Sequence, residues 1–241
     1  MVYFISSNQK VNHAMNDFNQ YAKTWHQPHG PMQALHHIHP IRMSFIQEFL
    51  SKPPLKILDA GCAGGLISLD LAKLGHQVTG VDLSPDLIEQ ARIKSDELKL
   101  DIQWVNCALE SFEPNEKYDM VICSEVLEHV TDPLQITKRL ISHLNPDGTI
   151  IISTINRTLT AFASAILGAE YLLQIIPKGT HRYDGFIDSK QLIYSIEETG
   201  LILKRLSGIC YNPLTYSAQL TRDTSVNYIL SAQYPRPSSP K

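Results

Sequence analysis

The stretch ILDAGCAGG, residues 57–65, decides the fold class. An apolar strand ends in Asp59 and runs into glycines, which let the backbone approach a ligand at the start of the next helix. The next expected strand, QVTGVD (77–82), ends in Asp82, 21 residues after Gly61. A carboxylate at that position can accept hydrogen bonds from both hydroxyls of a ribose. The stretch therefore predicts an α/β domain that binds a nucleoside.

Two nucleotide-binding fingerprints fail at this loop. Counted from Gly61, the dinucleotide pattern GxGxxG would need glycines where Ala63 and Leu66 stand, and no GK[ST] follows. What remains is an acid two residues before the first glycine, a motif shared by class I S-adenosylmethionine-dependent methyltransferases. In that resemblance Asp59 and the loop backbone face the methionine part of the cofactor, and Asp82 faces the ribose. An ordinary strand–helix turn of another α/β protein is the alternative, and Ala63, where the pattern D-x-G-x-G-x-G has glycine, costs a little at a crowded or positive-φ position.

Strands and helices alternate over the middle of the chain. Short, almost wholly apolar strands are expected at 55–59, 77–82, 102–106, 118–123 and 149–154, with helices between them. Ser84 and Pro85 suit the N-cap and the first position of one such helix. Apolar strands that alternate with helices predict a parallel sheet covered on both faces, the doubly wound α/β class.

The N-terminal part of the chain is expected to be helical. Helices are expected at 10–25 and 41–50, and residues 26–40, rich in His and Pro, are expected to connect them. The segment 1–54 is therefore predicted to form a helical cap.

The C-terminal part departs from the alternation in another way. Residues 157–187 interrupt it as an insertion, and a helix at 189–199 and a last strand at 207–211 are expected after them. These assignments predict one domain over 1–232, followed by a disordered tail at 233–241.

Composition and charge exclude several classes of protein. The chain has 241 residues, of which 43% are hydrophobic and 19% charged, which favours a sizeable core over a disordered or fibrous chain. A net charge of −3 lacks the basic excess of a nucleic-acid binder, so no nucleic-acid partner is expected. Four cysteines without a CxxC pair suit a reducing compartment. The longest apolar stretch, 161–176, contains Glu170 and is shorter than a membrane span of about 20 residues, which predicts a cytoplasmic protein.

Longer stretches give the chain a nearer resemblance. It resembles the ubiquinone-biosynthesis O-methyltransferases, which methylate polyprenyl catechols and demethylubiquinols, in LHHIHPIR (35–42), LDAGCAGG (58–65), CSEVLEHVTDP (123–133), STINR (153–157), GAEYLLQIIPKGTH (168–181) and YNP (211–213). The cofactor loop specifies only the superfamily, whereas the HPIR and GAEYLLQIIPKGTH segments are much more specific. The resemblance implies a Rossmann-like, mostly parallel, seven-stranded sheet with a helical cap and a helical lid inserted at 157–187.

The resemblance also assigns residues to the cofactor. It implies that Arg42, Gly61, Asp82 and Ser124 contact S-adenosylmethionine. A cap helix can place the guanidinium of Arg42 on the cofactor carboxylate, while a solvated surface arginine is the alternative. Ser124 lies at the carboxyl end of the expected fourth strand, where ligands bind in open α/β sheets.

Glu125, Glu128 and His129 form an E-x-x-E-H constellation directly after that strand. If the chain turns helical there, offsets of three and four residues place all three on one face, where they suit a divalent cation such as Mg²⁺. The resemblance supports Mg²⁺ as a second cofactor, because metal dependence is attributed to members of the family. A similar segment occurs in class I methyltransferases that need no metal, so Glu128 and His129 could instead hold loops and cap helices.

Two histidines are candidate catalytic residues. His129 would act through the metal, which would lower the pKa of a phenol from its ordinary value of about 10. His181, in the PKGTH segment, is a candidate general base or substrate contact, with a loop-stabilising hydrogen bond as the alternative. Five more histidines crowd into residues 26–39, where a polar lid near the cofactor is favoured over a metal site.

Residues 158–176 are apolar at helical spacing, and Glu170 is their only charged residue. They predict a lid helix that also touches the membrane, so that a polyprenyl substrate enters from the bilayer. Lys178 and Arg182 follow closely and suit anionic headgroups. A helix buried over the active site is the alternative. Peripheral association with the inner face of the membrane is expected on this ground.

The function that the family resemblance implies is methyl transfer to a phenolic oxygen of a polyprenylated catechol or demethylubiquinol in ubiquinone biosynthesis. The expected partners are that substrate, the membrane surface and other ubiquinone-biosynthesis enzymes. Two other functions stay open. One is a methyltransferase that acts on another small phenol or an amine, and the other is a non-catalytic protein that binds the cofactor and docks on membranes.

Overall fold

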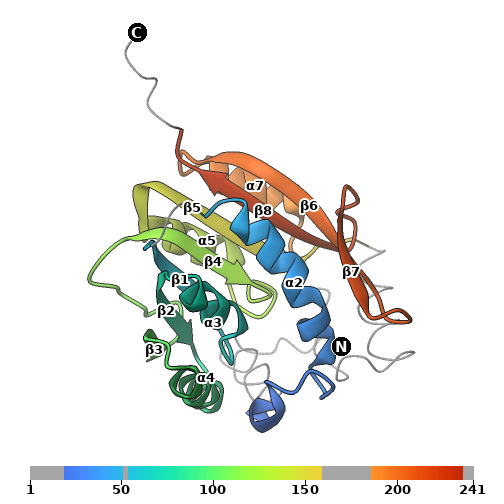
Figure 1. Ribbon diagram of the computed structural model, residues 1–241. Coiled ribbons are helices and arrows are strands. Elements are labelled where there is room, and N and C mark those ends of the chain that lie inside the picture. The colour runs from blue at the N-terminus through green and yellow to red at the C-terminus, as the bar shows by residue number, and fades with distance from the viewer. Residues whose placement is uncertain (1–18, 51–53, 159–185, 236–241) are drawn as a thin grey trace, which may run out of the picture.

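The computed structural model describes residues 19–50, 54–158 and 186–235. Its helices and strands are, in chain order, η1 (Ala22–Thr24), α2 (Gln33–Gln47), β1 (Lys56–Ala60), α3 (Leu66–Lys73), β2 (Gln77–Asp82), α4 (Pro85–Leu98), β3 (Ile102–Asn106), β4 (Tyr118–Ser124), α5 (Pro133–Ser142), β5 (Leu144–Ile155), α7 (Ser189–Glu197), β6 (Ile202–Asn212), β7 (Ser217–Thr221) and β8 (Asn227–Gln233). Figure 1 shows one twisted sheet with α2 crossing in front of it and α5 and α7 behind it.

The described strands form a single eight-stranded sheet in the order β3-β2-β1-β4-β5-β8-β6-β7. The five expected strands pair in parallel as β3, β2, β1, β4 and β5, which confirms the doubly wound arrangement. β8 then runs antiparallel between β5 and β6, and β7 closes the far edge as a hairpin with β6. The expected count of seven strands is therefore wrong by one, because β7 is a short, half-polar edge strand without the apolar run of a central strand.

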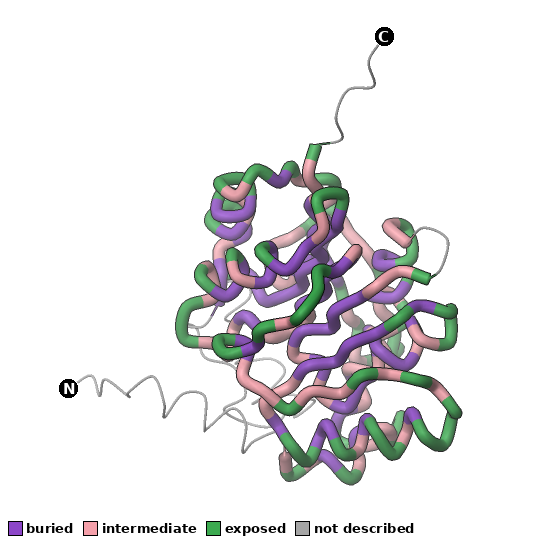
Figure 2. Tube along the Cα trace, turned by 90° about the vertical axis from the view of Figure 1, so that its left-hand side faces the viewer, coloured by how far each residue is buried: buried purple, intermediate pink, exposed green. Residues whose placement is uncertain are grey.

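The core lies on both faces of this sheet, because side chains alternate along each buried strand. The face under α2 and α3 collects Ile57, Val78, Met120, Ile122, Ile151 and Ile229. The face under α5 and α7 collects Leu58, Val81, Val121, Cys123, Ile150, Ile152, Tyr228 and Leu230. Figure 2 shows the buried residues along the central strands and the exposed ones on the outer sides of the helices.

Helix α2 begins at Gln33, inside the segment that was expected to be a connector. It contains Pro40, whose missing N–H and ring clash cost a helix interior about 3 kcal/mol. Ile38, Phe45 and Ile46 are buried against the sheet from the same helix, and each contributes about 1.5–3 kcal/mol of burial. Packing thus offsets the cost of the proline, and α2 is part of the layer that covers the sheet.

Several expectations fall on residues that the structure does not describe. They include most of the helix at 10–25, the lid helix with its membrane contact, His181, and the last residues of the tail. The described chain resumes with the buried Phe186 and Ile187, where the N–H of Ile187 donates to the carbonyl of Ile155 at 3.2 Å. Gln233 still belongs to β8, so the expected start of the tail at 233 is too early. In the described ranges, no helix is both long enough and apolar enough to cross a bilayer.

Candidate active site

The carboxyl ends of four parallel strands meet at one edge of the sheet. Ala60 at the end of β1 is in register with Val81 of β2 and with Cys123 of β4, and Ser124 of β4 is in register with Ser153 of β5. This register brings the loops after β1, β2, β4 and β5 to the same edge. It is the position at which open α/β sheets bind their ligands.

The glycine loop after β1 takes the left-handed conformation at three residues. Gly61, Ala63 and Gly65 have φ values of 77°, 47° and 82°. A Cβ on Gly61 would lie 2.2 Å from Cγ2 of Val126, so this position also has no room for a side chain. Ala63 has the positive φ that the sequence analysis considered, and this conformation costs about 1–2 kcal/mol relative to glycine.

Both tryptophans of the chain pack on this loop, a contact that the sequence analysis missed. A Cβ on Gly64 would lie 2.2 Å from Trp25, and a Cβ on Gly65 would lie 2.5 Å from Trp104. Trp25 is buried in the segment that precedes α2. The loop is therefore held between residues 19–32, which we call the N-terminal cover, and β3, with glycine where the indole rings approach. Two tryptophans in 241 residues were the available signal.

Asp82 joins the glycine loop to the next strand. Its carboxylate accepts the backbone N–H of Ala63 at 2.9 Å and that of Ser84 at 2.8 Å. Desolvation raises the pKa of this carboxyl, and the backbone donors partly counteract the rise. Ser84 in turn caps α4 by accepting the N–H of Leu87, as its sequence position predicted. Asp82 thus fixes two loops and stands at the edge expected for a ribose site.

Asp59 is almost fully buried at the end of β1, with 2% of its surface exposed. Its Oδ2 accepts a hydrogen bond from Oγ of Ser68 at 2.6 Å. Burial raises the pKa of the Asp59 carboxyl to about 6, and the nearby Asp82 adds to the rise. A buried carboxyl group with a raised pKa is more typical of a functional site than of a group that stabilises the fold.

A buried ion pair connects α2 to the end of β4. Nη2 of Arg42 lies 3.0 Å from Oε1 of Glu125, and the guanidinium is buried, with no hydrogen-bond partner for its Nε among the described residues. The alternative of a solvated surface arginine is therefore wrong. Glu125 holds a left-handed φ of 55°, which costs about 1–2 kcal/mol in a residue with a Cβ. The pairing directs Arg42 to the same edge as Asp59 and Asp82.

Two hydroxyl residues at the end of β5 complete this edge, and the sequence analysis gave them no role. Oγ of Ser153 donates to Oε1 of Glu125 at 3.1 Å and lies 2.8 Å from Oγ of Ser124. Oγ1 of Thr154 donates to Oε2 of Glu128 at 2.7 Å. The available signal was the change from apolar to hydroxyl residues at the end of the strand IIIST, which mirrors the position of Ser124.

The segment predicted to bind Mg²⁺ is a turn, not a helix. Glu125 is paired with Arg42 and Glu128 with Thr154, while the N–H of His129 donates to the carbonyl of Val126 at 2.9 Å. Oε1 of Glu128 is buried and has no partner in the described chain, and burial next to Glu125 raises the pKa of this carboxyl. Over the described residues, no three His, Cys, Asp or Glu side chains are grouped as a metal site. The expectation that Glu125, Glu128 and His129 share one face of a helix is therefore wrong.

The histidines of α2 have separate partners. Nε2 of His36 lies 2.7 Å from the carbonyl of Trp25, Nδ1 of His37 lies 2.9 Å from the hydroxyl of Tyr211, and Nε2 of His39 lies 2.8 Å from Oδ2 of Asp70. These bonds attach α2 to the N-terminal cover, to β6 and to α3. Their role in the described structure is to fix the helix that carries Arg42.

A protein-family model and curated relatives both match most of this chain. The family described as "Methyltransferase domain" matches residues 34–202. The "Ubiquinone biosynthesis O-methyltransferase" of Xylella fastidiosa (strain M23) is 39% identical over 226 residues, which cover 93% of this chain and 92% of the relative. The protein of the same name from Hydrogenovibrio crunogenus (strain DSM 25203 / XCL-2) is 41% identical over 221 residues, with coverages of 91% and 92%.

Solved structures share the fold at lower identity. Magnesium protoporphyrin IX methyltransferase from Synechocystis PCC 6803, with bound SAH, has a TM-score of 0.68 and 19% identity, covering 94% of this chain and 100% of its own. The N-methyltransferase NodS from Bradyrhizobium japonicum WM9, in complex with S-adenosyl-L-homocysteine, has a TM-score of 0.61 and 16% identity, with coverages of 96% and 100%. At these identities the likeness concerns the architecture.

A first test addresses the ribose assignment of Asp82. Replacement of Asp82 by Asn should weaken S-adenosylmethionine binding by about one to two orders of magnitude, because charge-assisted hydrogen bonds contribute about 1.5–3 kcal/mol each. Titration calorimetry measures the affinity. Asp86→Asn is the matched control, since Asp86 is exposed in the first turn of α4. An affinity unchanged within about twofold in Asp82→Asn would remove the ribose from this residue.

A second test uses the raised pKa of Asp59. The folded protein holds a proton on Asp59 more tightly than the unfolded chain, because the pKa rises from 3.8 to about 6. Ionisation of this group should therefore lower the free energy of unfolding as the pH rises through this interval, by about 3 kcal/mol in total. Asp59→Asn removes that loss, so its gain in stability over the wild type should grow between pH 4 and 6 and level off above.

Urea unfolding at several pH values measures this difference. The exposed Asp101 supplies the control variant Asp101→Asn. A stability difference between Asp59→Asn and wild type that does not change between pH 4 and 7 would contradict a raised pKa at Asp59.

Proposed function

The chain belongs to the ubiquinone biosynthesis O-methyltransferase family, and we propose that it transfers the methyl group of S-adenosylmethionine to a phenolic oxygen of a polyprenylated catechol or demethylubiquinol. Relatives of that name match it at 39–41% identity over more than nine-tenths of its length. It is an S-adenosylmethionine-dependent methyltransferase by domain and by fold. The structural observation that carries the proposal is the convergence of Arg42, Asp59 and Asp82 at one edge of the sheet.

The chemistry of these three side chains fits the cofactor. S-adenosylmethionine carries a carboxylate, an ammonium group and two ribose hydroxyls. Arg42 offers a buried guanidinium whose Nε has no partner in the described chain, which suits the carboxylate. Asp59 offers a buried carboxylate, which suits the ammonium group, and Asp82 can accept the ribose hydroxyls. A buried charge needs such a partner, because an isolated one is costly.

The cofactor, when bound, supplies an electrophilic methyl group. The residues of this chain then act by binding and alignment. The three left-handed residues of the glycine loop shape it so that its backbone can approach the ligand. Trp25 packs on Gly64 and covers the loop from outside. Holding donor and acceptor in line is worth a large share of the barrier in a transfer of this kind.

The acceptor side of the edge is lined by oxygen atoms. The hydroxyls of Ser124, Ser153 and Thr154 lie at the ends of β4 and β5. Oε1 of Glu128, in the turn after β4, has no partner among the described residues. A phenol, with a pKa of about 10, is almost wholly protonated at neutral pH, so the transfer requires a group that takes or shares its proton. The catalytic role of His129 remains a prediction. That of His181 does too, because this residue lies outside the described residues.

The predicted magnesium site does not fit the arrangement described. Glu125 is held by Arg42 and Ser153, and Glu128 by Thr154, so these carboxylates are engaged within the protein. We therefore derive no step of the reaction through a metal ion. Magnesium dependence stays a prediction from the family resemblance, and it would require Glu125 to exchange its partner.

A methyl-transfer assay with the chain of 241 residues tests the proposal. Polyprenylated catechol should be methylated with a kcat/KM at least about tenfold above that of a soluble phenol or amine of similar size, because only the former carries the apolar tail. Preference for the small phenol or the amine would assign another acceptor. Cofactor binding without turnover on any acceptor would leave only a cofactor-binding protein.

The same assay contains the metal test. If the magnesium prediction holds, exhaustive chelation should abolish activity, added Mg²⁺ should restore it, and Glu128→Gln should lose that response while it keeps its cofactor affinity. Thr137→Val, which removes a buried hydroxyl on α5, is a control for general damage. Full activity after chelation would show that Glu125 and Glu128 serve the hydrogen bonds described above.

A further inference from the structure

Ser153 of β5 binds Glu125 through both its main chain and its side chain. The backbone N–H of Glu125 donates to the carbonyl of Ser153 at 2.9 Å, and Oγ of Ser153 donates to Oε1 of Glu125 at 3.1 Å. A left-handed φ in a residue with a Cβ persists only where surrounding contacts fix it. These two bonds do so at Glu125, whose φ is 55°.

The proton of the Ser153 hydroxyl is committed to this contact. Oγ of Ser124 lies 2.8 Å from Oγ of Ser153, and either hydroxyl could donate there. A hydroxyl has one proton and two lone pairs, so Ser153 can only accept from Ser124 while it donates to Glu125. Ser153 is 1% exposed, so solvent has almost no access to these bonds. They form a chain that runs from Ser124 through Ser153 to Glu125.

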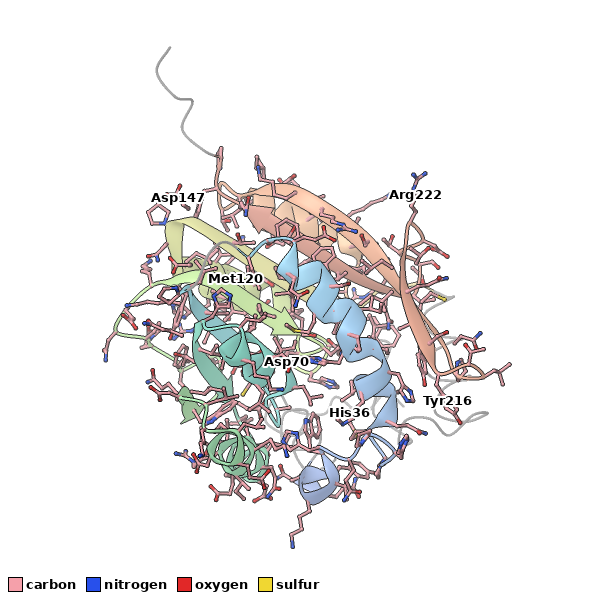
Figure 3. The ribbon with its side chains drawn as sticks, in the orientation of Figure 1. His36, Asp70, Met120, Asp147, Tyr216 and Arg222 are labelled. Atoms are coloured by element: carbon pink, nitrogen blue, oxygen red, sulfur yellow. The ribbon has the colours of Figure 1, made fainter. Side chains whose placement is uncertain are left out.

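The Ser153 hydroxyl lies on the face of the sheet that α2 covers. Side chains alternate along β5, and Ile151, two residues earlier, packs in the cluster under α2 and α3. Figure 3 shows α2, which carries the labelled His36, over the face to which Met120 of β4 contributes. The hydroxyl therefore acts on the side of the sheet from which Arg42 enters the site.

The carboxylate that Ser153 fixes is paired with the Arg42 guanidinium. Nη2 of Arg42 lies 3.0 Å from Oε1 of Glu125, the same oxygen that accepts from Ser153. A guanidinium is planar with donors in fixed directions, so a carboxylate held at one nitrogen sets where the others point. The buried Nε of Arg42 has no hydrogen-bond partner among the described residues, which leaves it available to the cofactor carboxylate.

We propose that Ser153 is a positioning residue for cofactor binding: through Glu125 it orients the Arg42 guanidinium so that this group receives the carboxylate of S-adenosylmethionine. The proposal rests on the proposed function, which places that carboxylate on Arg42. Without the Ser153 hydroxyl, the Glu125 side chain loses one of its anchors and the guanidinium loses its fixed direction. A planar fork that is free to turn matches a carboxylate less well.

This role concerns one group of the ligand, which distinguishes it from general support of the fold. Asp59, which suits the ammonium group, is held by the hydroxyl of Ser68. Asp82, which suits the ribose, is held by backbone N–H groups. Ser153 takes part in neither contact. Loss of its hydroxyl should therefore weaken the binding of ligands that carry the carboxylate and leave the binding of other ligands unchanged.

Titration calorimetry with two ligands tests the proposal. S-adenosylhomocysteine carries the carboxylate, whereas its decarboxylated form lacks this group and keeps the amine and the ribose. We expect Ser153→Ala to bind S-adenosylhomocysteine about fivefold more weakly than wild type, a loss typical of one hydrogen bond, and to bind the decarboxylated form like wild type. A chelator in every titration makes the result independent of the magnesium prediction.

Ser231→Ala is the matched control. Ser231 is fully buried on β8, and its Oγ has no hydrogen-bond partner among the described residues. Its replacement removes a buried hydroxyl of the same size from the strand next to β5. Both affinities should stay at the wild-type value in this variant.

Two results would overturn the positioning role. Wild-type affinity of Ser153→Ala for S-adenosylhomocysteine would show that Arg42 needs no hydroxyl at this position. An equal loss for both ligands would make Ser153 a residue that supports the end of the strand and not the direction of Arg42.

Arg42→Gln separates a failure of this proposal from a failure of the proposed function. This variant should lose more affinity for S-adenosylhomocysteine than Ser153→Ala does, because it removes the donor itself. A loss in Arg42→Gln without one in Ser153→Ala would refute the role of Ser153 alone. The titrations require no turnover, so a chain that binds as expected but methylates no phenol would refute the proposed function and support the role of Ser153.

Discussion

The carboxylate of Asp82 holds the two loops on which the site depends. It accepts the N–H of Ala63 in the glycine loop and the N–H of Ser84 at the start of α4, both within 3 Å. Charge-assisted hydrogen bonds of this kind contribute about 1.5–3 kcal/mol each, so the two together exceed the cost of about 1–2 kcal/mol at the left-handed Ala63. The loop is therefore fixed before any ligand arrives. A preformed loop of this kind avoids the ordering cost that a mobile one would add to cofactor binding.

The pair of Arg42 and Glu125 extends this edge to a third layer of the structure. Arg42 comes from α2, whose position depends on a buried apolar face and on the bonds of His37 and His39. One guanidinium then stands between Glu125 and the expected carboxylate of the cofactor. Because Nε of Arg42 has no partner in the described chain, the guanidinium has donors for both carboxylates. The magnesium prediction does not fit the described arrangement, because it would require Glu125 to leave Arg42.

Local patterns predicted the parallel half of the fold but not its edges. The strands with apolar runs, the cap at Ser84 and the loop after Asp59 all have short-range signals, and the structure has them as expected. Helix α2 forms in spite of Pro40, because burial against the sheet, a long-range effect, outweighs local helix propensity. The family resemblance drew attention to Arg42, but only the fold could show that it is buried against Glu125. The hydroxyl groups of β5 were missed because their role depends on strand register.

The most direct test of this account is a crystal structure of the chain with S-adenosylhomocysteine. The account predicts the ribose hydroxyls on the carboxylate of Asp82 and the ligand carboxylate on Arg42. Its ammonium group should lie beside Asp59. A ligand bound elsewhere on the molecule would contradict it. So would a ligand bound at this edge with its carboxylate away from Arg42 and with Asp82 in contact only with the backbone of Ala63 and Ser84.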